Sequence, residues 1–392
     1  MLILRIISSM TPSSGGPAQG VRNLIPALQK IGIESEVVCV DPPDSDYLGD
    51  DDFPVTALGP AHTRWGYCPS LSVWLEDNLM RFDIVILHGL WQFPGFALWK
   101  ALAKLSSRTG KVPPYYLYPH GMLDPWFQRD PSRKWKAQRN EVFWRLFDRR
   151  VVHGAAGVLF TCEQEMLLAR ETFQGYRPQA EINVGYGIPS PPEFGKPMKE
   201  AFAEACSSLP AGQPYLLFLS RIHPKKGIDL LLRAYGRLLA ENGNMPHLVI
   251  AGPLESAYAE EMKKLAQGVE KDDCAVTRVH FTGMLEGDEK WGALYGCQAF
   301  VLPSHQENFG IAVVEALACG KKVLITNRVN IWREIEDANA GWVVPDSLAG
   351  LVDGLGKVLG SEDFSELDSI SCYCEHFSVE GAVKSLKKLL ER

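Results

Sequence analysis

The stretch that decides the fold joins the end of a short apolar run to the start of a helix, and reads PSHQENFGIAVVEAL at positions 303–317. The run before it, AFVL at 299–302, is typical of a buried strand. From position 311 onward, apolar residues recur with helical spacing. The pattern therefore predicts a strand, a turn and a helix, with Glu307 in the turn and Glu315 inside the helix.

The two carboxylates flank a predicted helix start, where exposed backbone amides favour anions. Acidic side chains beside an anion site suit a ligand that carries both phosphates and hydroxyls, such as a nucleotide sugar. Helical rise puts roughly 10 Å between the two carboxylates along the axis, which is at or beyond the upper end of the spacing in two-carboxylate glycosidases. The alternative is that Glu315 is an ordinary helix residue and that Glu307 only complements the helix dipole.

Short apolar runs alternate with helical patterns along almost the whole chain. They lie at 2–8, 37–40, 84–88, 115–118, 158–161 and 182–184, and again at 215–220, 248–251, 279–282, 300–303 and 323–326. Continuous rather than alternating hydrophobicity predicts parallel strands that are covered on both faces. We therefore expect an α/β protein with two doubly wound domains, whose strand ends surround a shared cleft.

Clustered prolines in the middle of the chain indicate where the two domains join. The expected organisation is an N-terminal domain at 1–190, a linker at 191–213, a second domain at 214–376, and a helix at 377–392 that returns to the first domain. A length of 392 residues allows each domain a core of its own.

Composition excludes several classes of protein. A net charge of −7 and a pI near 5.8 argue against a basic nucleic-acid binder. Nine scattered cysteines without a C-x-x-C pair favour reduced thiols and no metal site. The longest apolar runs are too short to span a membrane, and the apolar start is broken by Arg5. We therefore expect a soluble cytoplasmic protein.

Three further motifs follow predicted strands. Arg221 and Lys226, in SRIHPKKG, could hold a diphosphate as a planar fork and a point charge, although basic loop residues are often only solvated. The glycines of SSGGP at 13–17 allow close backbone approach, but they lack the G-x-G-x-x-G spacing of dinucleotide-binding proteins. His120, in YPHG, is a candidate at the same edge, whereas a lone histidine is often structural.

Together these motifs resemble the retaining glycosyltransferases of family 4, also called group 1. The resemblance runs through the whole chain in the right order. Its most specific part is Glu307-x7-Glu315 within P-S-x-x-E-N-F-G, followed by Arg221 with Lys226 five residues later. The resemblance implies the GT-B fold, in which two Rossmann-like domains face a central cleft.

The resemblance also implies a role for each matching residue. Glu315 would hold the nucleotide ribose, and Glu307 would contact the donor sugar. Arg221 and Lys226 would clamp the diphosphate, and His120 would help to position the sugar near the reaction centre. Of these residues, four would act in catalysis: His120, Arg221, Lys226 and Glu307. The remaining donor-binding residues lie in loops that expose backbone: Gly15, Gly16, Met284, Leu285, Asn308, Phe309, Gly310 and Ile311.

The implied function is transfer of a hexose, with retention, from a nucleotide-diphosphate sugar to a saccharide or lipid-linked saccharide in cell-surface polysaccharide or glycoconjugate synthesis. UDP-hexose is the favoured donor and GDP-mannose the next. We expect no metal and no other cofactor, because the cations and the helix start can stabilise the leaving diphosphate. The alternatives are a GT-B sugar phosphorylase or epimerase, and a non-catalytic glycan- or nucleotide-binding protein with the same fold.

Aromatic residues follow two strands of the first domain. Trp91 and Trp126 could form a platform for an acceptor sugar, or they could fill the core. Asp124 could orient an acceptor hydroxyl or serve as a turn residue before Pro125.

The segment 129–150 combines eight cations and three acids with aromatic residues. It could rest on anionic lipid at the inner face of a membrane. The alternative is an ordinary helix with its aromatic face in the core and a solvated basic face.

Overall fold

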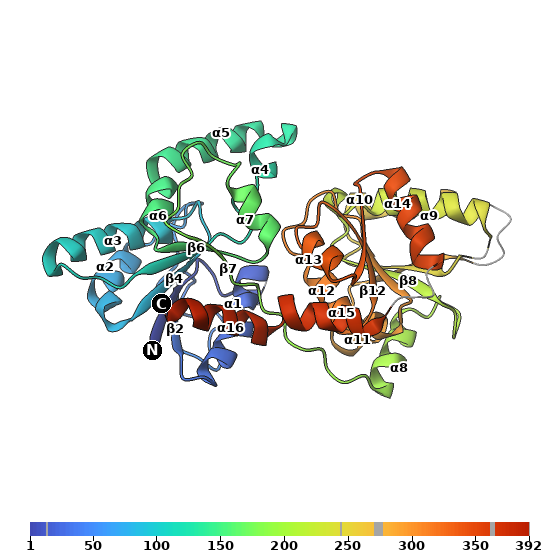
Figure 1. Ribbon diagram of the computed structural model, residues 1–392, viewed down its shortest axis with the longest axis horizontal. Coiled ribbons are helices and arrows are strands. Elements are labelled where there is room, and N and C mark those ends of the chain that lie inside the picture. The colour runs from blue at the N-terminus through green and yellow to red at the C-terminus, as the bar shows by residue number, and fades with distance from the viewer. Residues whose placement is uncertain (13–14, 244, 270–276, 361–364, 392) are drawn as a thin grey trace. The chain divides into compact units, whose positions relative to one another are not determined.

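The computed structural model describes residues 1–392 except 13–14, 244, 270–276, 361–364 and 392. The chain divides into two compact units, Met1–Gly187 with Val379–Arg392, and Ile188–Ser378. Each unit has its own parallel sheet with helices packed on it (Figure 1). In the described part of the chain, no helix is both long and apolar enough to cross a membrane.

The sheet of the first unit has the strand order β3-β2-β1-β4-β5-β6-β7. The strands are β1 Leu2–Ile6, β2 Glu34–Cys39, β3 Val55–Ala57, β4 Ile84–His88, β5 Tyr115–Tyr118, β6 Gly157–Phe160 and β7 Glu181–Asn183. All of its strand pairs are parallel. Because helices cover both faces of the sheet, the central strand β4 is buried at every position.

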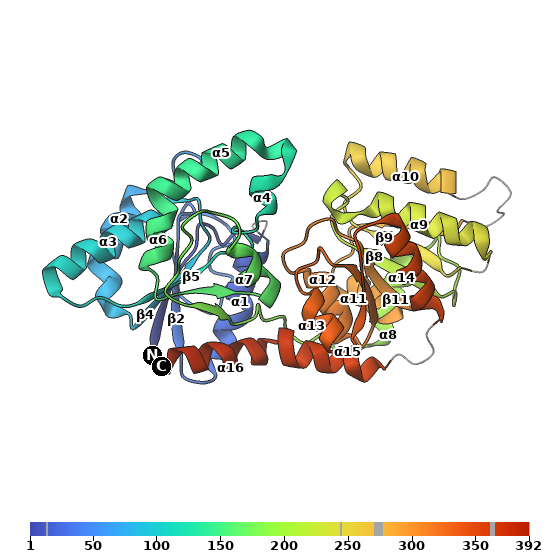
Figure 2. The same ribbon diagram turned by 45° about the horizontal axis from the view of Figure 1, so that its top comes forward.

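The helices of the first unit form two layers. They are α1 Gly16–Gln29, α2 Pro69–Asn78, α3 Phe93–Thr109, α4 Trp126–Arg129, α5 Lys134–Phe143, α6 Arg149–Gly154, α7 Glu163–Ala169 and α16 Val379–Leu390, with a π-helical turn at Trp144–Asp148 between α5 and α6. One apolar cluster joins the sheet to α2, α3 and α6, and another joins the opposite face to α1 and α16. Figure 2 shows these helices on either side of the strands.

The C-terminal helix α16 packs on α1 in the first unit. Its buried residues are Val379, Ala382, Val383 and Leu386, which recur with helical spacing and contact Leu24 and Leu28 of α1 through one cluster. The chain therefore returns from the second unit to the first between Ser378 and Val379, where this helix begins.

The sheet of the second unit has the order β10-β9-β8-β11-β12-β13, again with every pair parallel. The strands are β8 Tyr215–Leu219, β9 His247–Ala251, β10 Val279–Gly283, β11 Ala299–Leu302, β12 Lys322–Thr326 and β13 Gly341–Val344. The helices are α8 Lys196–Ala205, α9 Ile228–Glu241, α10 Ala257–Val269, α11 Gly287–Gly296, α12 Ile311–Ala318, α13 Trp332–Asp337, α14 Leu348–Gly360 and α15 Glu366–Cys372. The expected fold class, two doubly wound α/β units, is confirmed.

Residues 191–213, which we expect to form a linker, lie in the second unit and include α8. Met198 and Phe202 of this helix are buried. A Cβ on Gly292 of α11 would lie 2.0 Å from the Met198 carbonyl oxygen, so α8 and α11 are in backbone contact. The proline content of this segment hid the helix, because Pro197 occupies the first turn, where proline starts a helix rather than breaking it.

Candidate functional site

In the second unit the candidate residues gather at the carboxyl edge of the sheet, where β8 and β11 lie side by side and their loops diverge. Doubly wound sheets bind ligands at such a switch point. The two loops are in direct contact, because a Cβ on Gly227 would lie 2.0 Å from the Pro303 carbonyl oxygen. Gly227 also has a left-handed φ of 67°, so glycine is required there for two reasons.

The loop after β8 carries three cations. Lys226 ends a short 3₁₀ turn, Pro224–Lys226, and is half-buried. Arg221 is exposed. Burial first, and then the charges of Arg221 and Lys225, lower the pKa of Lys226 to about 8. The charges of the three cations therefore act on one another, and positive charge is concentrated in this loop.

The Glu307 carboxylate forms an ion pair with the Lys226 ammonium. The loop that carries Glu307 is fixed to the loop after β12. The Glu307 N–H donates to the Arg328 carbonyl at 3.0 Å, and the Asn330 N–H donates to the Glu307 carbonyl at 2.9 Å. The structure thus brings Glu307 and Lys226 together, as the sequence predicts, on loops from neighbouring strands.

Glu315 lies in α12, and its carboxylate pairs with Lys290 of α11 at 2.9 Å. Both side chains are mostly shielded from solvent. Lys290 was not predicted from the sequence, because it is 25 residues from Glu315 and belongs to no recognisable motif. Each of the two acids at this edge therefore has a lysine partner, which offsets the negative charge beside an anion site.

The other predicted donor-binding residues of this unit lie at the same edge. Gly310 has a left-handed φ of 84° and precedes α12, which starts at Ile311. Phe309 is buried, and its ring packs edge-on against Phe377 at 5.7 Å. Only the backbone of Phe309 is therefore suited to contact a ligand.

Asn308 lies between Glu307 and Phe309 and accepts a long hydrogen bond from Asn330 at 3.5 Å. Met284 and Leu285 follow β10, two strands away from β8. Leu285 is buried, whereas the side chain of Met284 is 59% exposed. Met284 and Leu285 therefore lie at the same edge of the sheet as the switch point, but farther along it.

In the first unit the switch point lies between β1 and β4. The loop after β1 includes the predicted glycine motif, of which Ser13 and Ser14 lie outside the described residues. Gly15 has a left-handed φ of 73°, and Gly16 is the first residue of α1. The Gly16 carbonyl accepts a hydrogen bond from the hydroxyl of Tyr186. At the start of α1, Gly15 is exposed and Gly16 is half-buried.

His120 follows β5 at the same edge and is hydrogen-bonded to His88, the last residue of β4 (2.9 Å between Nε2 and Nδ1). The two rings are nearly parallel. Burial lowers the pKa of His120 to about 3. Both rings are therefore neutral at pH 7, and one N–H is shared between them. His88 was not predicted as a site residue, although its place at the end of the neighbouring strand β4 could have indicated it.

The side chain of Arg5, in β1, is fully buried, and its nitrogens have no hydrogen-bond partner among the described residues. Burial, then His120, and then the charge of Arg5 lower the pKa of His88 well below its usual value. Arg5 thus adds to the environment that keeps the histidine pair neutral.

The aromatic candidates of the first unit have different surroundings. Trp91 packs against Phe173 at 5.3 Å, and Trp126 lies under the guanidinium of Arg133 at 5.5 Å. Asp124 is buried, and its carboxylate accepts a hydrogen bond from the Trp126 N–H at 2.8 Å. Asp124 therefore acts as a turn residue here.

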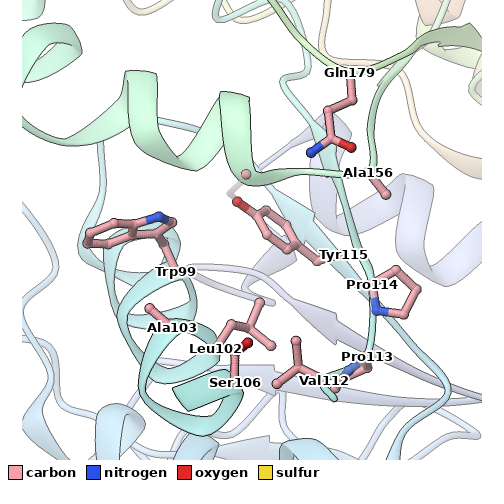
Figure 3. Close-up of a pocket in the computed structure, with 11 residues that line it drawn as sticks. Trp99, Leu102, Ala103, Ser106, Val112, Pro113, Pro114, Tyr115, Ala156 and Gln179 are labelled. Carbon is pink, nitrogen blue, oxygen red and sulfur yellow. The ribbon is translucent and has the colours of Figure 1, made fainter. Parts of the chain in front are cut away.

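An apolar pocket of about 360 Å³ lies elsewhere in the first unit, between α3 and the segments that lead into β5 and β6. Figure 3 shows Trp99 and Leu102 on one side and Pro113, Pro114 and Tyr115 on the other. The two prolines precede β5, so this pocket is at the amino edge of the sheet. The histidine pair is at the carboxyl edge, and the pocket is therefore a separate feature.

Metal-ligating side chains do not cluster in groups of three or more anywhere in the described ranges. The charged groups at the carboxyl edge of the second unit include two lysine–glutamate ion pairs, Lys226–Glu307 and Lys290–Glu315, with Arg221 near Lys226.

Family matches agree with this architecture. Residues 202–368 match the family Glycosyl transferases group 1, and residues 15–185 match the Glycosyl transferase 4-like domain. The first of these matches lies in the second unit and contains its whole sheet, and the other lies in the first unit and contains its sheet except for β1. The chain belongs to the group 1 glycosyltransferases and has their GT-B fold.

Individual relatives and solved structures agree with this assignment. A D-inositol 3-phosphate glycosyltransferase of Saccharomonospora viridis is 30% identical over 154 residues, which is 38% of this chain and 35% of that protein. The serotype-specific mannosyltransferase WbdA of Escherichia coli is 33% identical over 113 residues, 29% of this chain and 14% of that protein. The chain therefore spans about a third or less of the length of these relatives.

Two solved structures are similar over the full chain. A glycosyltransferase from Rickettsia africae has a TM-score of 0.73 at 15% identity, covering 100% of this chain and 97% of that one. Anabaena HepE in complex with UDP has a TM-score of 0.72 at 17% identity, covering 100% of both chains. At this identity the likeness establishes the fold alone.

Proposed function

We propose that the protein is a retaining hexosyltransferase that uses a nucleotide-diphosphate sugar as donor. The observation that carries this proposal is the group formed by Lys226, Glu307 and the start of α12 at the switch point of the second unit. Arg221 and Lys226 supply the positive charge that a diphosphate needs, and the carboxylate of Glu307 is an acceptor for sugar hydroxyls. UDP-hexose is the favoured donor, which the UDP complex of the similar HepE structure supports, and GDP-mannose is the next.

The donor would lie along the edge of the second unit. Glu315 would hold the ribose hydroxyls, and Met284 and Leu285 would pass their backbone along the base. The amides of Gly310 and Ile311 would face the phosphates at the start of α12, where the helix dipole favours negative charge. The acceptor would be a saccharide or lipid-linked saccharide in cell-surface polysaccharide or glycoconjugate synthesis.

Charge stabilisation accounts for the proposed reaction. Breaking the bond from sugar to diphosphate leaves an oxocarbenium-like centre and a diphosphate with additional negative charge. Arg221 and Lys226 can stabilise that charge directly, and removal of one such donor typically costs about 10²–10³ in kcat. Gly16 and His120 of the first unit would contact the donor phosphate and sugar. This account assigns the leaving-group role to side chains of the chain itself rather than to a metal ion.

The proposal is tested by incubating the protein with UDP-, GDP- and ADP-hexoses in the presence and absence of excess chelator, and measuring release of the nucleoside diphosphate. We expect release from one donor class, with a rate that changes less than about twofold on chelation. Loss of turnover in chelator, restored by magnesium or manganese, would contradict the metal-independent mechanism. Nucleotide binding without turnover on any donor would favour a non-catalytic binding protein.

We further propose that the segment 129–150 makes peripheral contact with anionic lipid on the cytoplasmic face of a membrane. Its aromatic residues divide into two sets. Trp144 is buried, whereas Trp135 is 85% exposed. Val142 and Leu146 are also exposed and lie among the cations of the segment. An exposed apolar residue beside cations suits the boundary between lipid head groups and acyl chains.

Membrane contact is tested by sedimentation with phospholipid vesicles at low salt. We expect the protein to sediment with anionic vesicles, to stay in solution with neutral ones, and to be released by added salt, because screening weakens the attraction. Replacing the exposed Trp135 with serine should reduce binding, whereas replacing the exposed Met80 of the same unit should not. Equal recovery in solution with both kinds of vesicle would contradict the contact.

A further inference from the structure

Two turns at the carboxyl edge of the first unit have unusual backbone conformations. Trp91, after β4, has a φ of 64°, and His120, after β5, has a φ of 50° and is followed by Gly121 at 78°. The left-handed region is uncommon for a residue with a side chain and is energetically unfavourable there. Such conformations persist only where the surroundings impose them.

A buried carboxylate binds the backbone of each turn. Glu165, in the first turn of α7, is 2% exposed and accepts a hydrogen bond from the Gly121 N–H. Asp148, in the π-helical turn, is 5% exposed and accepts from the Trp91 N–H at 3.0 Å. Asp148 therefore binds Trp91, whose backbone is strained. Glu165 binds Gly121, which directly follows the strained residue His120.

Burying a carboxylate is costly, so an apolar side chain would serve better if these residues only filled space. Glu165 offsets this cost with two further bonds, from the Thr161 N–H at 2.8 Å and the Thr161 hydroxyl at 2.6 Å, and with its place near a helix start. Asp148 has fewer partners. One of its oxygens has none among the described residues, and burial raises the pKa of this carboxyl to about 7.

The two turns are also joined to each other. His88 and His120 share a hydrogen bond, the Gly89 N–H donates to the Tyr118 carbonyl at 2.8 Å, and the Leu90 N–H lies 3.1 Å from the sulfur of Met122. A shift in one turn would therefore displace the other, and with it the histidine pair.

We propose that Glu165 and Asp148 are positioning residues, which hold the turns of His120 and Trp91 so that the paired histidine rings keep the geometry needed for sugar transfer. The catalytic consequence rests on the proposed function, whereas the effect on ring geometry does not. Glu165 is also the third residue of α7, where a glutamate often caps the start of a helix. Capping alone would not require the hydrogen bond that Glu165 accepts from the Gly121 N–H. The two roles are separable by experiment.

The first test replaces Glu165 with glutamine. The glutamine side chain has a single oxygen, so it can accept from only one of the two backbone N–H groups, those of Gly121 and Thr161. Its NH₂ group then faces the other N–H, which is also a donor. We expect kcat to fall about tenfold or more, because small misplacements near a reaction centre have such effects. The donor KM and the affinity for UDP should change less than about twofold. Glu163→Gln, in the same helical turn but exposed, is the matched control and should leave all three quantities unchanged.

The direct readout is the NMR signals of the His88 and His120 rings, recorded with labelled histidine and assigned with His→Gln variants. We expect Glu165→Gln to shift the ring signals of both residues while the fold is retained. Unchanged ring signals and kcat, with only a lower Tm, would show that Glu165 is a capping residue and overturn the proposal. If no donor is turned over by the parent protein, the ring signals still decide this question.

The second test compares two replacements of Asp148. Asparagine keeps an oxygen that can accept from the Trp91 N–H, whereas leucine removes it. We expect Asp148→Asn to retain the histidine signals and most of kcat, and Asp148→Leu to lose both. If Asp148→Leu does not fold, the asparagine variant decides alone, because loss of the histidine signals in it would show that the acceptor oxygen is not what positions the turn.

Discussion

Replacing Glu307 with alanine is expected to lower turnover by about 10²–10³-fold, which is the range for removing one polar group that acts in the transition state. The carboxylate is expected to bind the donor sugar while its neighbour Lys226 binds the diphosphate, so its loss should affect kcat more than nucleotide affinity. The measurement is kcat and KM on the best donor, together with the affinity for free UDP.

The control for this variant is Glu336→Ala, which removes an exposed glutamate of α13 in the same unit. It should leave turnover unchanged. A Glu307→Ala protein that keeps more than about half of the parent kcat would contradict the assigned role. A protein that loses UDP affinity as strongly as kcat would show that Glu307 acts on the nucleotide rather than on the sugar.

Replacing Glu315 with alanine is expected to weaken UDP binding by about 10–100-fold. A hydrogen bond to a charged group contributes about 1.5–3 kcal/mol, and each 1.4 kcal/mol is a factor of ten in affinity. The substitution also leaves Lys290 without its partner at 2.9 Å. The measurement is calorimetric titration with UDP.

A second pair of variants separates the two effects of losing Glu315. Lys290→Ala leaves the carboxylate in place and should reduce affinity less than Glu315→Ala. The double variant should be no weaker than Glu315→Ala, because residues in contact are not additive. If Lys290→Ala alone abolishes binding, then the lysine rather than the glutamate contacts the nucleotide.

Much of the fold was predictable because buried parallel strands are continuously apolar. The strands β4 and β11 were predicted for this reason, since every one of their positions is buried. The strand β3 was missed, because it has three residues of intermediate burial at the edge of its sheet. The edge strand β13 was missed for a similar reason, since only Val344 of its four residues is buried.

The candidate site was predictable where its chemistry is local in sequence. Glu307, Glu315 and the cations of the β8 loop belong to short motifs with recognisable spacing. Contacts between distant segments were not predictable, because no local pattern reports them. The pairing of Lys290 with Glu315 joins two helices, and that of Asp148 with Trp91 spans 57 residues. Such partners decide how the motif residues are held.

The central claim is that the edge of the second unit binds a nucleotide sugar with Glu315 at the nucleotide and Glu307 at the sugar. The most direct test titrates UDP into Glu307→Ala and Glu315→Ala side by side under identical conditions. The account predicts near-parent affinity in Glu307→Ala and a loss of about 10–100-fold in Glu315→Ala, equivalent to roughly 1.4–2.8 kcal/mol. Equal affinities in the two variants, whether both retained or both lost, would contradict it.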